Sequence, residues 1–293
     1  MNTTYNTKSI RIGIVSFIIV LLFMPLGHSL MILNEKIFIE YKYWGAFTIG
    51  LLGVVLLAFS LSQTVKNSIS TLLGLLAGIF VWTGWIEFSF VWIAEKLNIP
   101  ALIENGEVVT KPEYLIMPSS IGLLGVFFLV FLFSFNKCQF FNWFQSVLKI
   151  LPNVKMKGSV KPIAITTFLE TVMILWTFYI VLLLVYDESI AGDKHLLTYI
   201  VAFGSLAWSI YLFNNLIRIK NFDSAIRYAV PTVIIFWNFV EILGRWGLFK
   251  EIWVHPFEYK IEIGITTLTL LLFISYYYFN TRKMTVLKLS NNN

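Results

Sequence analysis

The sequence predicts an all-α integral membrane protein with eight transmembrane helices, and its composition and its apolar runs lead to this fold class. Hydrophobic residues make up 58% of the chain and charged residues 13%, with a mean hydropathy of +0.78. A soluble chain of this length could not bury so much apolar surface, whereas a bilayer solvates it. The runs are unbroken and about 20 residues long, as spanning helices require, and not alternating segments of about 10 residues as in transmembrane barrels. The predicted spans are, in chain order, about 12–32, 43–63, 70–94, 116–136, 162–186, 196–217, 228–248 and 261–279.

The first run, about 12–32, has features of a secretory signal peptide. Lys8 and Arg11 precede its apolar stretch, as in the charged start of such a peptide. The run continues through Pro25 and His28, however, without a small-residue cleavage site. We therefore interpret it as a retained transmembrane helix.

The loop between the third and fourth runs contains a turn signal. Asn105 and Gly106 stand between two short apolar stretches. Asn-Gly is the favoured pair for a type I′ turn, so we expect a small β-hairpin outside the membrane. The corresponding loop of the second half is shorter. An insertion of this kind either covers a binding site or is decorative, and the sequence leaves both interpretations open.

The segment that joins the fourth and fifth runs is amphipathic. Aromatic and aliphatic residues between Phe140 and Leu151 alternate with Asn142, Gln145 and lysines. This pattern predicts a helix that lies at the inner membrane surface and ends before Pro152. The single cysteine, Cys138, excludes an internal disulfide or a cysteine-rich metal site.

The last four runs repeat features of the first four. Glu87 and Trp92 recur at one common offset as Glu241 and Trp246, and Lys66-Asn67 recurs as Lys220-Asn221. Four spans per unit is an even number, so two such units would have the same orientation, related by a pseudo-two-fold axis along the membrane normal. We therefore predict two fused four-helix repeats. The predicted parts are 1–136 for the first repeat, 137–161 for the cytoplasmic linker and 162–293 for the second repeat.

Charge placement predicts the orientation. Most lysines and arginines lie in the segments on the same side as the two termini, whereas most acidic residues outside the spans lie on the other side. The positive-inside rule then puts both termini in the cytoplasm and the protein in the plasma or inner membrane. The net charge of +6 has its explanation in these flanks, and no basic patch with interleaved aromatic residues indicates nucleic-acid binding.

Acidic residues inside the predicted spans indicate a functional site, since ionisable groups are costly in hydrocarbon. Glu87 and Glu241 occupy matching positions in the two repeats. Asn238, Glu241 and Arg245 share one face of a helix, and the spacing of Glu241 and Arg245 allows a direct ion pair. We expect the two glutamates to form the walls of one ligand site. A structural ion pair is the alternative.

Four further residues are candidates for ligand binding. Glu170 lies near the midplane of the fifth run, His28 near the outer end of the first run, and Trp92 and Trp246 at the outer boundary. The tryptophans have an ordinary alternative role in an interfacial aromatic belt. No pair of histidines has metal-ligand spacing, so we predict no metal site.

The sequence contains no motif of a nucleotide-binding loop, a nucleophile elbow, a kinase or a zinc enzyme, and it identifies no cofactor. The interpretation is a membrane protein that binds or transports a small ion or polar solute at an outward-facing site between the repeats. One alternative is an accessory or assembly subunit that pairs with a partner protein in the bilayer. A further alternative is a membrane enzyme that acts on lipid or quinone, with a carboxylate as its acid or base.

Overall fold

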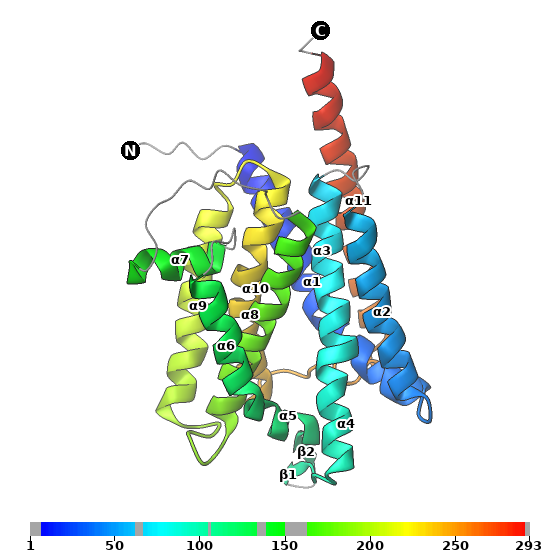
Figure 1. Cartoon of the computed structure of the whole chain (residues 1–293), viewed down its shortest axis with the longest axis vertical. Helices are drawn as coiled ribbons and strands as arrows, with labels where there is room; N and C mark the ends of the chain where they lie inside the picture. Colours follow the sequence, from blue (N-terminus) through cyan, green and yellow to red (C-terminus); the bar gives the residue numbers. More distant parts are fainter. Residues whose placement is uncertain (1–6, 62–66, 105–106, 134–138, 150–162, 291–293) are drawn as a thin grey trace.

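The computed structural model describes residues 7–61, 67–104, 107–133, 139–149 and 163–290. The described chain folds into a bundle of long helices with a small two-stranded hairpin at one end (Figure 1). The elements are α1 (Thr7–Ile37), α2 (Lys42–Ser60), α3 (Asn67–Val81), a π-helical segment (Trp82–Glu87), α4 (Phe88–Lys96), β1 (Leu102–Glu104), β2 (Glu107–Thr110), α5 (Pro112–Ile116), a 3-10 turn (Met117–Ser120), α6 (Ile121–Phe133), α7 (Gln139–Leu148), α8 (Ile163–Tyr186), α9 (Leu196–Leu216), α10 (Phe222–Arg245) and α11 (Lys260–Ser290).

The predicted multi-pass helical architecture is confirmed. Within the described residues, eight helical segments are long and apolar enough to cross a membrane, and they match the eight predicted runs in order. The third span is continuous from Asn67 to Lys96 and contains the π-helical segment. In such spans the backbone satisfies its own hydrogen bonds, which is what permits an apolar chain to enter hydrocarbon.

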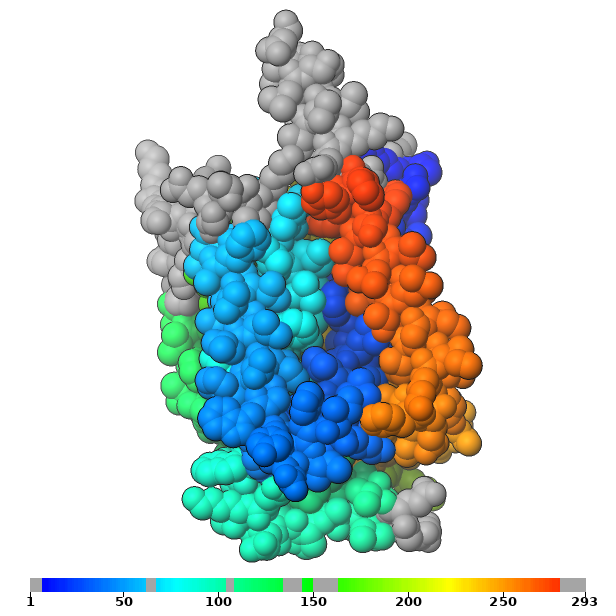
Figure 2. Space-filling model, turned by 90° about the vertical axis from the view of Figure 1, so that its right-hand side faces the viewer, coloured from blue at the N-terminus to red at the C-terminus, as the bar shows by residue number. Residues whose placement is uncertain are grey.

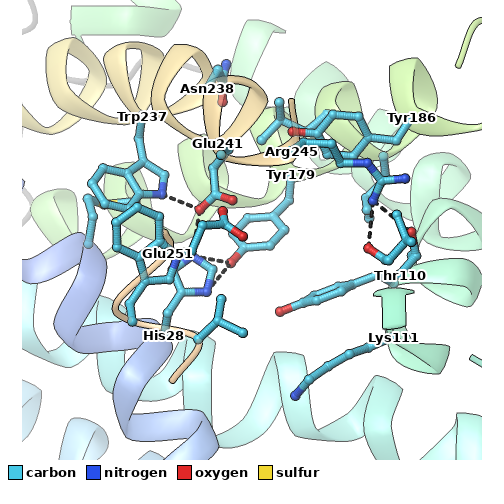
Figure 3. Close-up of a pocket in the computed structure, with 18 of the residues that line it drawn as sticks. His28, Thr110, Lys111, Tyr179, Tyr186, Trp237, Asn238, Glu241, Arg245 and Glu251 are labelled. Carbon is cyan, nitrogen blue, oxygen red and sulfur yellow. Dashed lines mark hydrogen bonds and ion pairs between the residues drawn. The ribbon is translucent and has the colours of Figure 1, made fainter. Parts of the chain in front are cut away.

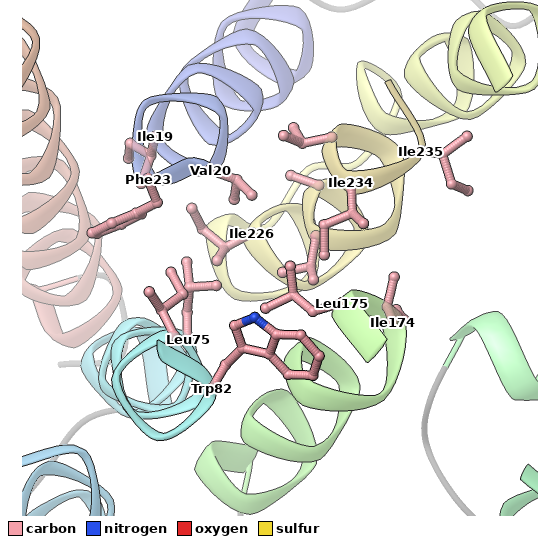
Figure 4. Close-up of a cluster of buried hydrophobic side chains, with 14 of the residues drawn as sticks. Ile19, Val20, Phe23, Leu75, Trp82, Ile174, Leu175, Ile226, Ile234 and Ile235 are labelled. Carbon is pink, nitrogen blue, oxygen red and sulfur yellow. The ribbon is translucent and has the colours of Figure 1, made fainter. Parts of the chain in front are cut away.

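The spans form a central set and a peripheral set. About 61% of the apolar window of each of the spans Asn67–Lys96, Ile163–Tyr186 and Phe222–Arg245 is buried inside the protein, compared with 39% for α1 and no more than 22% for the other four. Figure 4 shows α1, α3, α8 and α10 meeting through aliphatic side chains and the ring of Trp82. The four central helices therefore supply the walls of any internal site.

The peripheral helices present apolar side chains outward. On α2, Phe47, Val55 and Phe59 are exposed, as are Ile265 and Leu272 on α11. Figure 2 shows α2 and α11 on one face of the molecule with part of α1 between them. Exposed apolar side chains along the full length of a helix are expected where lipid is the solvent.

The predicted hairpin is confirmed in its strands. β1 and β2 pair antiparallel at the end of the bundle opposite the start of α1 (Figure 1). The predicted turn at Asn105-Gly106 lies outside the described residues. The predicted linker helix is present as α7, which lies across the direction of the other helices. Pro152, where we expected that helix to end, also lies outside the described part.

Candidate functional site

A cavity of about 480 Å³ lies among α1, α8 and α10 at the hairpin end of the bundle. The hairpin and the segment 247–254 complete its walls (Figure 3). Apolar side chains such as Met24, Leu175 and Phe178 line its deeper part. The polar and charged side chains that line it are His28, Thr110, Lys111, Tyr114, Tyr179, Tyr186, Asp193, Asn238, Glu241, Arg245 and Glu251.

Glu241 faces the cavity from α10 and has two partners. The indole Nε1 of Trp237 donates a hydrogen bond to Oε1 of Glu241 over 2.6 Å. These residues are four apart on one helix, which places their side chains side by side. The Nε2 atom of His28 lies 3.3 Å from the same oxygen. The carboxylate is therefore oriented by its own helix and joined to α1 across the bundle.

His28 links Glu241 to the next central helix. Its Nε2 atom also lies 3.1 Å from the hydroxyl oxygen of Tyr179 on α8. The ring of Tyr179 packs against the rings of Trp82 and Tyr114 at centroid distances of 5.4 Å and 6.2 Å. A histidine between a carboxylate and a phenol can exchange a proton with either.

Glu87 lies outside the cavity wall, next to Tyr114. It is the last residue of the π-helical segment and is 2% exposed. Tyr114, which lines the cavity, donates a hydrogen bond from its hydroxyl to Oε1 of Glu87 over 2.9 Å. Glu241 therefore lines the cavity, whereas Glu87 is separated from it by one tyrosine ring.

The π-helical segment sets the position of Glu87. A π-bulge adds a residue to a turn and turns the following side chains relative to an α-helix. Gly84 within it packs so closely on α2 that a Cβ atom there would collide with the backbone of Gly50. No sequence pattern predicted this bulge, although a Thr-Gly pair inside an apolar run is compatible with one.

Arg245 does not form the ion pair expected with Glu241. Within the described chain its salt bridge is to Asp193, with Nε 2.8 Å from Oδ1. Its Nη1 atom donates to the carbonyl oxygen of Val109 and to the hydroxyl of Thr110, over 2.7 Å and 2.9 Å. The reason is position: Arg245 is the last residue of α10, so its long side chain reaches past the helix end to the hairpin and to the 187–195 loop.

Asn238 supports the predicted shared face, since it lines the cavity together with Glu241 and Arg245. It is 2% exposed, and its Nδ2 atom has no hydrogen-bond partner among the described residues. The hydroxyl of Tyr186, also in the cavity wall, is likewise without one in this part of the chain. Buried polar atoms are nearly always hydrogen-bonded, so two such atoms without partners in the wall of one cavity are a notable feature of this site.

Glu170 lies outside the cavity. It is 4% exposed and forms a two-point ion pair with Arg227, with Oε1 2.7 Å from Nη2 and Oε2 3.0 Å from Nε. This pair joins α8 to α10 toward the end of the bundle where α1 begins. Along the sequence, Arg227 has the position of a flanking basic residue, so its role as the partner of Glu170 was missed.

Trp92 and Trp246 also lie outside the cavity lining. The Trp92 side chain is 50% exposed, with the ammonium group of Lys96 lying 4.9 Å from its ring centroid. The indole of Trp246 donates to the carbonyl oxygen of Asp193 over 2.8 Å and packs on Tyr199. The aromatic rings of the cavity wall are instead those of Trp237, Trp253, Phe178 and the tyrosines.

Lys111 was not among the predicted site residues. It follows the hairpin directly, and its ammonium group lies 3.0 Å from Oε2 of Glu35 and 3.6 Å from Oε1 of Glu113. Burial alone would lower the pKa of Lys111, but these carboxylates raise it above its ordinary value. Lys111 therefore stays charged and joins the hairpin to the end of α1.

Glu251 was missed as well, because it lies in a connection outside the spans. Burial raises the pKa of Glu251 to about 7, and the nearby carboxylate of Glu241 acts in the same direction. Between its unfolded-state pKa and its folded-state pKa, the unfolded chain releases this proton while the folded protein keeps it, so stability falls as the pH rises.

We therefore expect Glu251→Gln to change how stability depends on pH. Between about pH 4.5 and pH 7 the wild type loses stability that the variant keeps, so the variant gains about 3 kcal/mol relative to the wild type. Above pH 7 the difference is constant. Unfolding midpoints measured across this range test the expectation, with the exposed Glu258→Gln as the control. A difference between the two curves that did not vary with pH would contradict it.

Comparisons of the chain with protein-family models, with curated proteins and with solved structures find no match. Among the described residues, no group of three or more His, Cys, Asp or Glu side chains is arranged to hold a metal ion. The site is a polar cavity between the central helices, in which carboxylate, imidazole and phenol groups lie within hydrogen-bonding range of one another.

Proposed function

We propose that this protein binds or transports a small polar solute in the cavity among α1, α8 and α10. The observation that carries the proposal is the cavity wall itself: its volume of about 480 Å³ suits a small molecule, and Asn238 and Tyr186 present buried polar atoms without partners in the described chain. The carboxylates of Glu241 and Glu251 and the ring faces of Trp237 favour a solute with a cationic group.

The inward placement of the glutamates favours this proposal over an accessory subunit. A subunit that used Glu87 and Glu241 to pair with a partner would present them on its outer surface. Glu87 is instead 2% exposed inside the bundle, and Glu241 lines the cavity. The enzyme alternative requires an activated nucleophile or a cofactor beside a carboxylate. The described cavity wall contains no Ser or Cys and only one Thr, Thr110, and the ammonium group of Lys111 is held by Glu35 and Glu113.

Within the proposal, the two halves are duplicated units and the cavity opens to the outside. The packing partners support the duplication. α3 packs on α8 as α10 packs on α1, α2 packs on α3 as α9 packs on α10, and α6 packs on α8 as α11 packs on α1. The charge distribution supports the orientation, since the cavity lies at the end of the bundle away from the basic flanks of the termini.

The test is solute binding by the protein in lipid nanodiscs. Tetramethylammonium, glycine betaine and glycerol represent a cation, a zwitterion and a neutral polar solute. We expect a cationic or zwitterionic probe to raise the thermal unfolding midpoint, and Glu241→Gln to weaken its binding about tenfold or more, because the negative charge that attracts the quaternary ammonium group is lost. The amide oxygen of the substituted side chain would still accept the bond from Trp237, so the fold should survive.

The matched control is Glu258→Gln, which removes a carboxylate from an exposed position near the same end of the bundle, where Glu258 pairs with His255. It should leave binding unchanged. Binding of every probe that is insensitive to Glu241→Gln, or the failure of all three probes to bind, would contradict the proposal.

A further inference from the structure

A series of proton-bearing groups extends from the cavity to Glu87. It starts at Glu241, whose Oε1 lies 3.3 Å from Nε2 of His28, and continues to the hydroxyl of Tyr179 3.1 Å from the same nitrogen. The ring of Tyr179 packs against the ring of Tyr114 at a centroid distance of 6.2 Å, which brings the two phenols side by side. Tyr114 in turn donates to Oε1 of Glu87 over 2.9 Å. The first four groups of the series lie on α10, α1, α8 and α5, and the last, Glu87, lies in the π-helical segment.

We propose that this series moves a proton between the cavity and Glu87, so that Glu87 is a proton site coupled to, but separate from, the solute site. The cavity end of the inference rests on the proposed function. The other end does not, because Glu87 does not line the cavity in the described structure. The proposal makes binding of the solute at Glu241 and protonation at Glu87 interdependent.

The transfer balances at every group. Glu87 in its acid form gives its proton to the Tyr114 oxygen, which releases its own proton toward Tyr179. The Tyr179 hydroxyl proton passes to Nε2 of His28, and the resulting Nε2–H gives its proton to Oε1 of Glu241. Each tyrosine oxygen regains the proton that it loses, and Nε2 receives one proton and releases one. Both tyrosines and the imidazole end as they began, and the net change is one proton moved from Glu87 to Glu241.

The surroundings of the two ends explain why a proton can reside at either. His28 is faced by Glu241 of α10, by Glu251 of the 247–254 segment, by Tyr179 of α8 and by the charge of Glu87. Glu87 is faced by Tyr114 and Glu113 of α5, and by the charge of Lys111. Acidic groups therefore outnumber basic ones along the series, so an additional positive charge is stabilised electrostatically.

A proton fits Glu87 better than a metal cation does. Its hydrogen-bond partner is a hydroxyl that donates, and no cluster of oxygen ligands surrounds it in the described chain. A metal ion of the alkali or alkaline-earth series requires several oxygen ligands around it. A carboxyl with one donor next to it satisfies the requirements of proton exchange.

The experiment follows His28 and Glu87 in the full-length protein in nanodiscs, without any solute. The chain has three histidines, so His195→Asn together with His255→Asn leaves His28 as the single imidazole. Its ¹⁵N chemical shift is followed as a function of pH. We expect Glu87→Gln to displace the midpoint of the His28 transition by about half a pH unit or more, because interacting groups titrate together.

A second measurement separates proton transfer from a purely electrostatic link. The infrared band of the protonated Glu87 carboxyl, assigned by its loss in Glu87→Gln, is followed in time after a jump in pH. We expect Tyr114→Phe and Tyr179→Phe to slow its appearance about tenfold or more, because each removes one hydroxyl from the series. Tyr199→Phe, on the Trp246 ring outside the series, is the matched control.

Failure of this inference and failure of the proposed function give different experimental results. An unchanged His28 midpoint in Glu87→Gln, or an unchanged rate in Tyr114→Phe, overturns the inference while the solute-binding test is unaffected. If Glu87→Gln displaces the His28 midpoint but no solute probe binds, the proposed function is contradicted. The proton series is then a property of the fold. A shifted midpoint with slowed protonation in both tyrosine variants supports the inference.

Discussion

Arg227→Leu is expected to destabilise the protein by about 3 to 5 kcal/mol, which is the typical cost of breaking a buried ion pair by removing one of its members. Arg227 binds both carboxylate oxygens of Glu170, and Glu170 is 4% exposed between α8 and α10. Without the guanidinium, that buried carboxylate loses a partner that binds both of its oxygens. Unfolding midpoints in detergent or in nanodiscs measure the effect.

The matched control is the double variant Glu170→Leu/Arg227→Leu, which replaces both charges with apolar side chains. It should recover most of the lost stability, because no buried charge remains. The stability of Arg227→Lys should lie between that of the wild type and that of Arg227→Leu. Its ammonium group keeps the positive charge but cannot bind two carboxylate oxygens in the fork geometry of a guanidinium. A double variant as unstable as Arg227→Leu alone would show that packing, and not the ion pair, holds these helices.

The spans were predictable because the membrane imposes a requirement on every segment independently. A run of about 20 apolar residues must form a helix in hydrocarbon whatever its neighbours are. The hairpin was predictable for a similar reason, since the Asn105-Gly106 turn signal is local. The composition therefore predicted the eight spans, and local turn chemistry predicted the strands at Leu102–Glu104 and Glu107–Thr110.

The partners of the charged residues were not predictable in the same way. Spacing along one helix suggested that Glu241 pairs with Arg245, yet Glu241 lies against His28 of α1 and Arg245 against Asp193. Helical spacing states which residues can meet on one helix, but it contains nothing about the groups that other helices bring to the same place. For residues in the interior of a bundle, those groups decide the pairing.

The polar series between the two glutamates combines predictable and unpredictable features. That Glu87, Glu241 and His28 belong to one neighbourhood followed from their depth in the spans. That Tyr114 and Tyr179 join them could not follow, because tyrosines are frequent in this chain and the two lie on different helices. The π-helical turn that orients Glu87 adds a residue that no apolar periodicity reveals.

Arg245→Met is expected to loosen the closure of the cavity at the hairpin. The guanidinium of Arg245 holds the carbonyl oxygen of Val109, the hydroxyl of Thr110 and the carboxylate of Asp193 together, and it lies 4.6 Å from the ring centroid of Tyr186. Methionine keeps much of the side-chain volume but donates no hydrogen bond. Asp193 is partly exposed, so water replaces part of the lost interaction, and we expect a loss of about 2 to 3 kcal/mol of global stability.

The local effect should exceed the global one. The hairpin has only two short strands, which are marginal by themselves, so its order depends on contacts such as that with Arg245 and that between Lys111 and Glu35. Amide hydrogen exchange in β1 and β2 should therefore accelerate about tenfold or more in Arg245→Met, while exchange in α9 stays unchanged. Arg218→Met is the control, since Arg218 follows α9 at the opposite end of the bundle. If the hairpin exchanged at the wild-type rate in Arg245→Met, the guanidinium would not be what orders the two strands beside the cavity.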